Sequence, residues 1–303
     1  MPTEQNLINV QALGEAKSID YVNRMTIGLK KLFEALSVTN KIPMNVGSVV
    51  KQYRFKVVDS TQPNGDVAEG DEIPLTKVER EKVIITELQF KKFRKSTSAE
   101  AIQSHGYSIA VDRTDKELLR HVQKKFRADF FATLKEALDN SKRTNKKVLK
   151  AESLQGALAK GRANLSVLLD DEITPIAFVN PNDVAEHLAN GLINSNGAVF
   201  GMNLLTNYVG ARVIEFSDIP EGEIWLTTSE NLNVAYANPN GDLSLAFSLT
   251  TDETGFIGVI HNSIPNRLTT ETIFAHAIKL FPENIDAVVR VKIEKKASTP
   301  ASA

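Results

Sequence analysis

The feature that most constrains the fold of this chain is an apolar stripe at helical spacing between residues 114 and 138. Large apolar side chains recur there at every fourth position, the spacing of one helix face: Leu118, Val122, Phe126, Phe130, Leu134 and Leu138. Thr114 and Glu117 have the spacing of a capping box, and the stretch contains neither glycine nor proline. The pattern predicts one helix about 36 Å long at 1.5 Å per residue, which exceeds the usual three or four turns.

Composition excludes several classes of function. The chain has 303 residues, enough for one large domain or two smaller ones. Its 36 basic and 37 acidic residues give a net charge of −1, whereas proteins that bind nucleic acid through phosphates usually show a basic excess. Mildly basic stretches lie at Lys91–Lys95, Lys142–Lys150 and Lys292–Lys296. The absence of cysteine excludes disulfides, thiolate metal sites and cysteine nucleophiles.

We also expect no targeting or membrane segment. The N-terminus lacks the basic and apolar regions of a signal peptide. No window approaches 18 consecutive apolar residues, the length that a membrane-spanning helix needs. A chain without cysteine also fits an intracellular protein.

The first half of the chain predicts both helices and strands. Residues 1–17 are polar and without a clear period, so we expect an N-terminal arm. Residues 18–37 carry a helical stripe, and residues 49–59 alternate as a strand does. Residues 154–169 predict another helix, weakened by Gly156 and Gly161.

The second half begins with a strand–helix unit and continues mostly as strands. An apolar strand at residues 173–179 leads to Asn180 as N-cap and Pro181 as the first helical residue, with Gly191 just past the end. After Gly210 strands dominate, and the pair Asn240-Gly241 predicts a tight hairpin. Residues 271–281 read as a helical turn or mixed segment, and residues 286–296 as a closing strand.

Three carboxylates crowd a turn cluster at residues 61–74, TQPNGDVAEGDEIP. Glu69, Asp71 and Glu72 surround Gly70, and such a group raises the question of a metal loop. Calcium loops place oxygen ligands at alternate positions and end in a glutamate, a pattern that is missing here. We therefore favour exposed turn chemistry over a metal site.

The next segment, residues 75–93, predicts an extended ribbon rich in charge. Its early charged positions are Lys77, Glu79, Arg80, Glu81 and Lys82. Further along, Thr86, Leu88 and Phe90 alternate with polar residues, as in a two-faced strand. A strand this polar does not fill a core, so we predict that it protrudes or pairs with something outside its own subunit.

No motif argues for catalysis. The five histidines stand at positions 105, 121, 187, 261 and 276, without the HxxxH or HxH spacing of metal ligands. The sequence has no GxSxG elbow, no phosphate-binding GxxxxGK[ST] loop and no GxGxxG after a strand. Lys91, Lys92, Arg94 and Lys95 interleave with Phe90 and Phe93. Such a pattern suits single-stranded nucleic acid, but we favour an ordinary strand with one buried and one solvated face.

The order of these segments resembles the major capsid protein of tailed bacteriophages, the Hong Kong 97 (HK97)-like fold also found in herpesvirus floors and encapsulin shells. VAEGDEIP and the charged ribbon resemble the family's extended loop, and residues 114–138 resemble its spine helix. PIAFVNPNDVAEHLAN resembles a strand and helix of the axial domain. GARVIEFSDIPEGEIWLTTSENLNVAY and FPENIDAVVRVKI resemble the stretches that return to and close the peripheral domain.

The resemblance implies an α+β fold with an N-terminal arm, an extended β-hairpin loop, a long spine helix, a peripheral domain and an axial domain. On this basis we divide the chain into five parts. They are an arm and helix (1–48), a peripheral strand with the extended loop (49–110), the spine helix and peripheral domain (111–172), the axial domain (173–270), and a return to the peripheral domain with a C-terminal tail (271–303).

The resemblance also implies a function. Subunits would assemble as pentamers and hexamers into an icosahedral shell around double-stranded DNA, in the virion, after assembly in the host bacterial cytoplasm. Expected partners are further copies of the chain, a separate scaffolding protein, a portal and a decoration protein. No enzymatic activity, cofactor, metal or membrane is expected. The extended loop would contact a neighbouring subunit through Glu69, Asp71, Glu72, Lys77, Glu79, Arg80, Glu81 and Lys82.

Two alternatives and one open question remain. The same fold serves encapsulin-like cargo compartments, and a soluble α/β hydrolase-like enzyme with an unrecognised site is the alternative of another class. Some relatives join their subunits by a lysine–asparagine isopeptide bond. Lys91, Lys92 or Lys95 and Asn262, Asn266 or Asn284 are possible partners. Nothing selects a pair, so we predict no cross-link.

Overall fold

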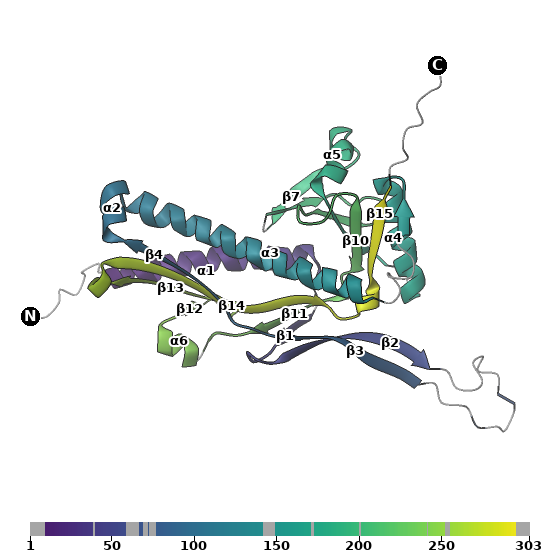
Figure 1. The fold of residues 1–303 in the computed structure, drawn as a ribbon, viewed down its shortest axis with the longest axis horizontal. Helices are drawn as coiled ribbons and strands as arrows, with labels where there is room; N and C mark the ends of the chain where they lie inside the picture. Colours follow the sequence, from purple (N-terminus) through teal and green to yellow (C-terminus); the bar gives the residue numbers. More distant parts are fainter. Residues whose placement is uncertain are drawn as a thin grey trace, which may run out of the picture.

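The spine of the molecule is one long helix, α3 (Thr114–Asn140), in a computed structural model (Figure 1). The structure describes residues 10–38, 40–58, 67–68, 72, 77–141, 149–170, 173–199, 201–240, 242–251 and 255–294. The predicted helix is confirmed, and Val122, Phe126, Phe130 and Leu134 on its stripe are buried. Its length arises because no glycine or proline interrupts the buried stripe.

The predicted capping box at the start of this helix is wrong. A π-helical turn, η1 (Ser108–Arg113), leads directly into α3, so Thr114 already has helical backbone angles. The Thr114 hydroxyl donates to the carbonyl oxygen of Ala110 at 2.7 Å. The side chain therefore bonds back into the preceding turn and does not cap the helix.

Two large sheets and one two-stranded ribbon make up the β structure of the described residues. The first sheet has the order β1-β11-β14-β13-β12, with β4 paired to β14. The strands are β1 (Asn40–Pro43), β11 (Leu232–Ala237), β14 (Thr269–Pro282), β13 (Ile257–Ile264), β12 (Thr250–Thr251) and β4 (Lys91–Ser98). We call this the long sheet, because β14 runs through its middle for 14 residues.

The second sheet has the order β5-β15-β10-β6-β9-β8-β7. Its strands are β5 (Leu149–Ala151), β15 (Val288–Ile293), β10 (Glu223–Thr228), β6 (Pro175–Val179), β9 (Arg212–Glu215), β8 (Met202–Leu205) and β7 (Ser195–Val199). Helix α4 (Leu154–Leu169) packs against β15 and β10. In Figure 1 this sheet stands above one end of α3, whereas the long sheet lies along the length of α3.

One hydrophobic core joins the long sheet to two helices. Helix α1 (Val10–Ala35) packs on β13, and α3 packs on β14. Met25 and Leu29 of α1 belong to the same buried cluster as Phe126 and Phe130 of α3. The predicted helix at residues 18–37 is thus confirmed, but it begins at Val10, inside the stretch expected to be an arm.

The strand–helix unit predicted at residues 173–191 is present in the structure. Strand β6 is fully buried and leads into α5 (Pro181–Ala189). The Asn180 side chain accepts a hydrogen bond from the Asn182 amide at 2.9 Å, as an N-cap does. Gly191 has a φ of +66° just after the helix, a conformation that glycine adopts without steric cost. This prediction is confirmed.

Two predictions in the second half are wrong. No hairpin forms at Asn240: β11 ends at Ala237, the Asn238 side chain bonds the Asn240 amide at 2.9 Å, and α6 (Asp242–Phe247) follows. Strand β11 instead pairs with β14 and β1, because an Asx turn leads the chain away from the sheet. Residues 271–281 belong to β14 and are not a mixed segment. This strand is largely buried, and a buried strand lacks the alternation that identifies strands from sequence.

The remaining described helices are short. Helix α2 (Ala99–His105) follows β4, η2 (Pro265–Arg267) connects β13 to β14, and η3 (Ile285–Ala287) precedes β15. No described helix is both long enough and apolar enough to cross a membrane.

Candidate assembly surface

A two-stranded ribbon extends away from the body of the subunit. Strands β2 (Val49–Val58) and β3 (Lys77–Glu87) pair antiparallel from Val49 opposite Glu87 to Val58 opposite Lys77. Both strands run out below the long sheet in Figure 1, and neither joins either large sheet. Strand β2 also touches the body at an isolated bridge, where the Tyr53 amide donates to the carbonyl oxygen of Glu283 at 2.9 Å. A two-stranded ribbon gains little stability by itself.

Ion pairs fix the middle of the ribbon to the body. Arg54 is buried, and its guanidinium donates to Asp286 at 3.0 Å and to the carbonyl oxygen of Asn140 at 2.9 Å. The same side chain pairs with Glu81 across the ribbon at 3.3 Å. Arg54 therefore ties the ribbon to the end of α3 and to η3, and this fixes the direction in which the ribbon leaves the subunit.

Arg80 makes a second anchor on the opposite strand. It pairs with Glu283 at 2.5 Å, and its guanidinium lies over the Tyr53 ring at 3.8 Å from the centroid. Both arginines thus bond to carboxylates more than 200 positions away in the chain. Of the predicted contact residues, Arg80 and Glu81 hold the ribbon to its own subunit.

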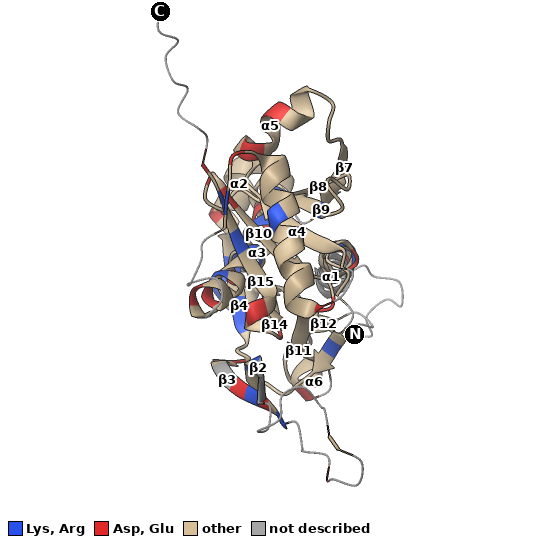
Figure 2. Cartoon of the chain, turned by 90° about the vertical axis from the view of Figure 1, so that its right-hand side faces the viewer, with Lys and Arg blue, Asp and Glu red and all other residues tan. Residues whose placement is uncertain are grey.

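The outer part of the ribbon is exposed. Lys77 and Glu79 pair with each other at 2.8 Å, and the hydrogen bond to Glu79, together with its charge, raises the pKa of Lys77. Figure 2 shows acidic and basic positions next to each other along β3. Val78, between Lys77 and Glu79, is 62% exposed, and Ile85, opposite Lys51 near the base of the ribbon, is 65% exposed. Exposed apolar side chains also lie off the ribbon, as at Val167 (82%) and Leu245 (81%), so these two alone do not define an interface.

Only part of the predicted turn cluster lies in the described residues. Glu72 is exposed. Glu69 and Asp71 lie outside the described residues, and Lys82 is described only as a backbone position within β3.

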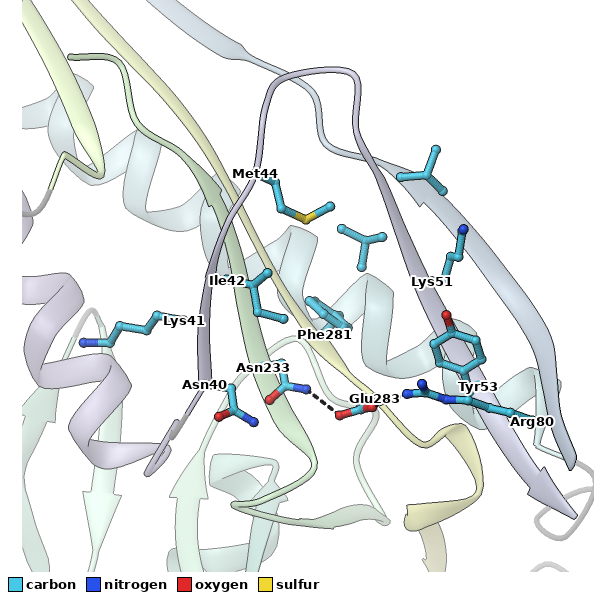
Figure 3. A pocket seen from close by; sticks show the side chains of 12 residues that line it. Asn40, Lys41, Ile42, Met44, Lys51, Tyr53, Arg80, Asn233, Phe281 and Glu283 are labelled. Atoms are coloured by element: carbon cyan, nitrogen blue, oxygen red, sulfur yellow. Dashed lines mark hydrogen bonds and ion pairs between the residues drawn. The ribbon is translucent and has the colours of Figure 1, made fainter. Parts of the chain in front are cut away.

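A groove opens beside the base of the ribbon, where β1 turns into β2 (Figure 3). It has a volume of about 570 Å³. It is lined by Asn40, Lys41, Ile42, Met44, Val49, Val50, Lys51, Tyr53, Arg80, Asn233, Phe281 and Glu283. The apolar part contains Ile42 and Phe281, and the Arg80–Glu283 pair closes one end. Sequence reasoning missed this groove because its walls come from separate strands that lie far apart in the chain.

The basic stretch on β4 is engaged within the subunit. Lys91 pairs with Asp129. Arg94 pairs with Glu271, and this contact lowers the pKa of the Glu271 carboxyl. Lys95 pairs with Asp115 at 2.6 Å. These pairs support the interpretation of residues 91–95 as an ordinary strand, because their charges are largely compensated.

Asp115 is the centre of a buried polar cluster that the sequence did not indicate. Its carboxylate is fully buried and accepts from Lys95 and from the Tyr21 hydroxyl at 3.0 Å. Burial and then this carboxylate raise the pKa of Tyr21. His261 lies 3.8 Å from Asp115 and is hydrogen-bonded to Thr272 at 2.8 Å. The cluster connects α1, α3 and the long sheet.

No catalytic or metal arrangement is found in the part of the chain that the structure describes. Within it, no three histidine, aspartate or glutamate side chains lie close enough to hold a metal ion. The two buried histidines have separate surroundings, since His276 is packed between Phe93 and Phe126.

Comparison with known proteins identifies the fold. No protein-family model matches the sequence, and no curated protein matches it. Among solved structures, the chain is similar to the holo-SrpI encapsulin complex from Synechococcus elongatus PCC 7942, at 12% identity and a TM-score of 0.53. That match covers 88% of this chain and 90% of the encapsulin chain.

The chain is similarly close to the capsid of the cyanophage P-SCSP1u. The identity is 9% and the TM-score 0.52, over 87% of this chain and 88% of the capsid chain. Both likenesses extend over nearly the whole chain, so they concern its complete architecture. The predicted resemblance and the predicted α+β, HK97-like fold are confirmed.

Proposed function

We propose, from the premise that this chain has the HK97 fold, that it is a major capsid protein. Its subunits assemble as pentamers and hexamers into an icosahedral shell that encloses double-stranded phage DNA. The observation that carries the proposal is the anchored ribbon, which extends away from the body of the subunit and joins neither large sheet (Figure 1). A neighbouring subunit is the proposed partner of this ribbon.

The ribbon acts as the contact arm of each subunit. Its direction is set by Arg54 and Arg80 in the middle of the ribbon, so every copy presents the tip in the same way. The proposed contact residues are Glu69, Asp71, Glu72, Lys77, Glu79, Arg80, Glu81 and Lys82. Mixed charges of this kind set register more than affinity, and each exposed pair contributes only about 0–1 kcal/mol. Weak, repeated contacts allow wrongly placed subunits to dissociate.

The same function assigns domains to the chain, partners to the subunit and a location to the assembled shell. We assign residues 49–110 to a peripheral strand with the extended loop, 111–172 to the spine and peripheral domain, and 173–270 to the axial domain. A scaffolding protein, a portal and a decoration protein are the proposed partners, in a virion assembled in the bacterial cytoplasm. The net charge of −1 suits a wall that encloses DNA without sequence specificity and without tight binding. The proposed role is structural and not enzymatic.

An encapsulin-like compartment is the second candidate. The specific observation in its favour is the likeness to the Synechococcus encapsulin complex, whose TM-score of 0.53 stands beside 0.52 for the phage capsid. Both candidates require the same assembly of subunits into a closed shell. They differ in what the shell contains, which is packaged DNA for a capsid and protein cargo for an encapsulin.

Electron microscopy of the expressed protein, alone and with its scaffolding partner, tests the shell. We expect closed particles of megadalton mass. A uniform 33.3 kDa species under every assembly condition would contradict the proposal and favour a small soluble enzyme. Particles from infected or native cells then separate the two candidates, because nuclease-protected DNA supports the capsid and an enclosed protein supports the encapsulin.

A paired substitution tests the role of the ribbon. Val78→Asp with Ile85→Asp should abolish shells and leave the subunit folded, because both side chains are exposed in the monomer. Val167→Asp on α4, which is 82% exposed, is the matched control for an exposed apolar side chain off the ribbon and should leave assembly intact. Sedimentation measures assembly, and circular dichroism measures folding.

A further inference from the structure

A half-buried arginine lies where α3 meets the second sheet. The guanidinium of Arg127 is 5.8 Å from the centroid of the Phe216 ring, which follows β9. On another side the guanidinium packs against Gly201, in the turn between β7 and β8, and a Cβ atom at that position would collide with it. Figure 1 shows β7 above the middle of α3. Glycine at position 201 therefore leaves the space that the guanidinium occupies.

The positive charge of Arg127 has no counter-charge in contact with it. Among the described residues it makes no hydrogen bond or ion pair, and its Nε atom is buried without an acceptor. Burial lowers the pKa of Arg127, and the more distant Asp218 acts in the opposite direction. A charge that is partly withdrawn from water without a partner is costly. Binding an anion at this place would relieve that cost.

Other basic side chains that are withdrawn from water in this fold have carboxylate partners. Arg54 pairs with Asp286 at 3.0 Å, and Lys95 pairs with Asp115 at 2.6 Å. Arg127 lacks such a partner, which indicates that its counter-ion comes from outside the chain.

The preceding turn of α3 adds two polar side chains on the same face. Gln123 and Lys124 stand four and three residues before Arg127, the spacing of neighbours on a helix surface. Lys124 is exposed, and no ion pair among the described residues involves it. Together the three side chains can supply donors to an anion that has more than two acceptor oxygens.

We propose that Arg127, with Gln123 and Lys124, binds a phosphate oxyanion at the junction of α3 and the second sheet. The planar guanidinium suits this ligand, because it donates two parallel hydrogen bonds to phosphate oxygens. The site lies within one subunit, so the inference goes beyond the proposed shell function and does not depend on it.

Calorimetric titration of the full chain with inorganic phosphate, at constant pH and ionic strength, tests the site. We expect saturable binding by the wild type, and binding weakened by at least about tenfold in Arg127→Gln, because hydrogen bonds to charged groups are strong. Lys135→Gln is the matched control. Lys135 is exposed on the same helix without an ion pair among the described residues, so its loss should leave phosphate binding unchanged.

Thermal unfolding separates a binding role from a packing role. In chloride, Arg127→Gln should unfold at the same temperature as the wild type or higher, because an uncompensated charge is removed. Phosphate should raise the unfolding temperature of the wild type and not that of the variant. Asp218→Asn should tighten phosphate binding, because it removes a nearby negative charge. If Arg127→Gln instead unfolds at a lower temperature in chloride and still binds phosphate as the wild type does, the arginine only fills the space beside Gly201 and the proposal is overturned.

A short double-stranded DNA, titrated in the same way, identifies the source of the phosphate. DNA binding that is weakened in Arg127→Gln supports a site for the nucleic-acid backbone, and saturable binding of inorganic phosphate alone supports a site for a free anion. Absence of saturable binding of either probe by the wild type overturns the proposal. That result leaves the shell standing, because closed particles are detected separately by microscopy.

Discussion

At the scale of single residues, the most consequential side chain is Asp115. It is fully buried and holds Lys95 and Tyr21 in place between α1, α3 and the long sheet. A buried ion pair adds little stability when complete, because desolvation offsets the attraction. Losing one partner is costly, because the other charge stays buried.

We therefore predict that Asp115→Ala lowers the free energy of unfolding by about 3–5 kcal/mol. Glu117→Ala on the same helix is the matched control. Glu117 pairs with Arg120 in an exposed i,i+3 contact, so its loss should change stability by only about 0–1 kcal/mol. Urea unfolding measures both, and equal effects would show that the cluster is not stabilised by Asp115.

The buried side chain of His276 should make the stability of the fold depend on pH. His276 is buried, and neither ring nitrogen has a hydrogen-bond partner among the described residues. Burial, and then the charge of Lys91, lower the pKa of His276 to about 4, although Asp129 acts in the opposite direction. The unfolded chain binds a proton at this histidine near pH 6.5, whereas the folded chain binds it only near pH 4. The folded state therefore keeps its full stability above pH 6.5 and loses part of it as the pH falls towards 4.

The loss should approach about 3 kcal/mol, at about 1.36 kcal/mol per pKa unit. His276→Leu should remove this part of the pH dependence between about pH 6.5 and 4. His105→Leu, at the exposed end of α2, should leave the dependence unchanged. Unfolding free energies across this range provide the measurement, and a slope that persists in His276→Leu would contradict the assignment.

At the scale of elements, α4 shows how packing overrides helix propensity. Its two glycines predicted a weak helix, yet it runs for 16 residues. A Cβ atom at Gly161 would lie 2.6 Å from Leu226 on β10. Glycine is therefore needed for the close approach of α4 to the sheet, although alanine is the better helix former by about 1 kcal/mol.

We predict that Gly161→Ala destabilises the protein by about 1–3 kcal/mol, the usual cost of overpacking. Gly156→Ala is the control in the same helix. Its Cβ would approach only Ser153 at 3.3 Å and Ala151 at 3.7 Å, so we expect a smaller effect. Thermal unfolding compares the two, and a Gly161→Ala variant as stable as wild type would show that α4 can move away from β10.

At the scale of the whole molecule, the question is whether subunits join covalently. Lys91 pairs with Asp129, and the half-buried Lys95 pairs with Asp115. The Asn284 side chain caps η3 by accepting from the Asp286 amide at 3.1 Å. Each of these groups is therefore occupied within its own subunit.

We predict that purified particles show only the 33.3 kDa band on a denaturing gel. A ladder of higher bands after boiling would refute this prediction, and mass spectrometry would identify the linked lysine. Lys92 is the first candidate in that event, because among the described residues its side chain makes only a contact at 5.9 Å with the Phe90 ring.

The sequence by itself determined the elements whose signals are local. Periodicity over about 25 residues specified α3, and cap chemistry around Asn180 and Pro181 specified the strand–helix unit. The polarity of residues 75–93 predicted a protruding ribbon, because charged side chains are costly to bury. Strand β3 (Lys77–Glu87) does extend from the body, but the prediction is wrong for the end of this range, where Leu88 is buried and β4 begins at Lys91 within the long sheet.

Only the tertiary structure decided what depends on distant contacts. The local pattern does not identify β14 as a strand. Most of its side chains are buried, so the alternation of apolar and polar residues is missing. The anchors of Arg54 and the walls of the groove join positions more than 200 residues apart. Contacts of this kind cannot be predicted from local sequence, because each residue alone resembles an ordinary surface residue until the fold brings the partners together.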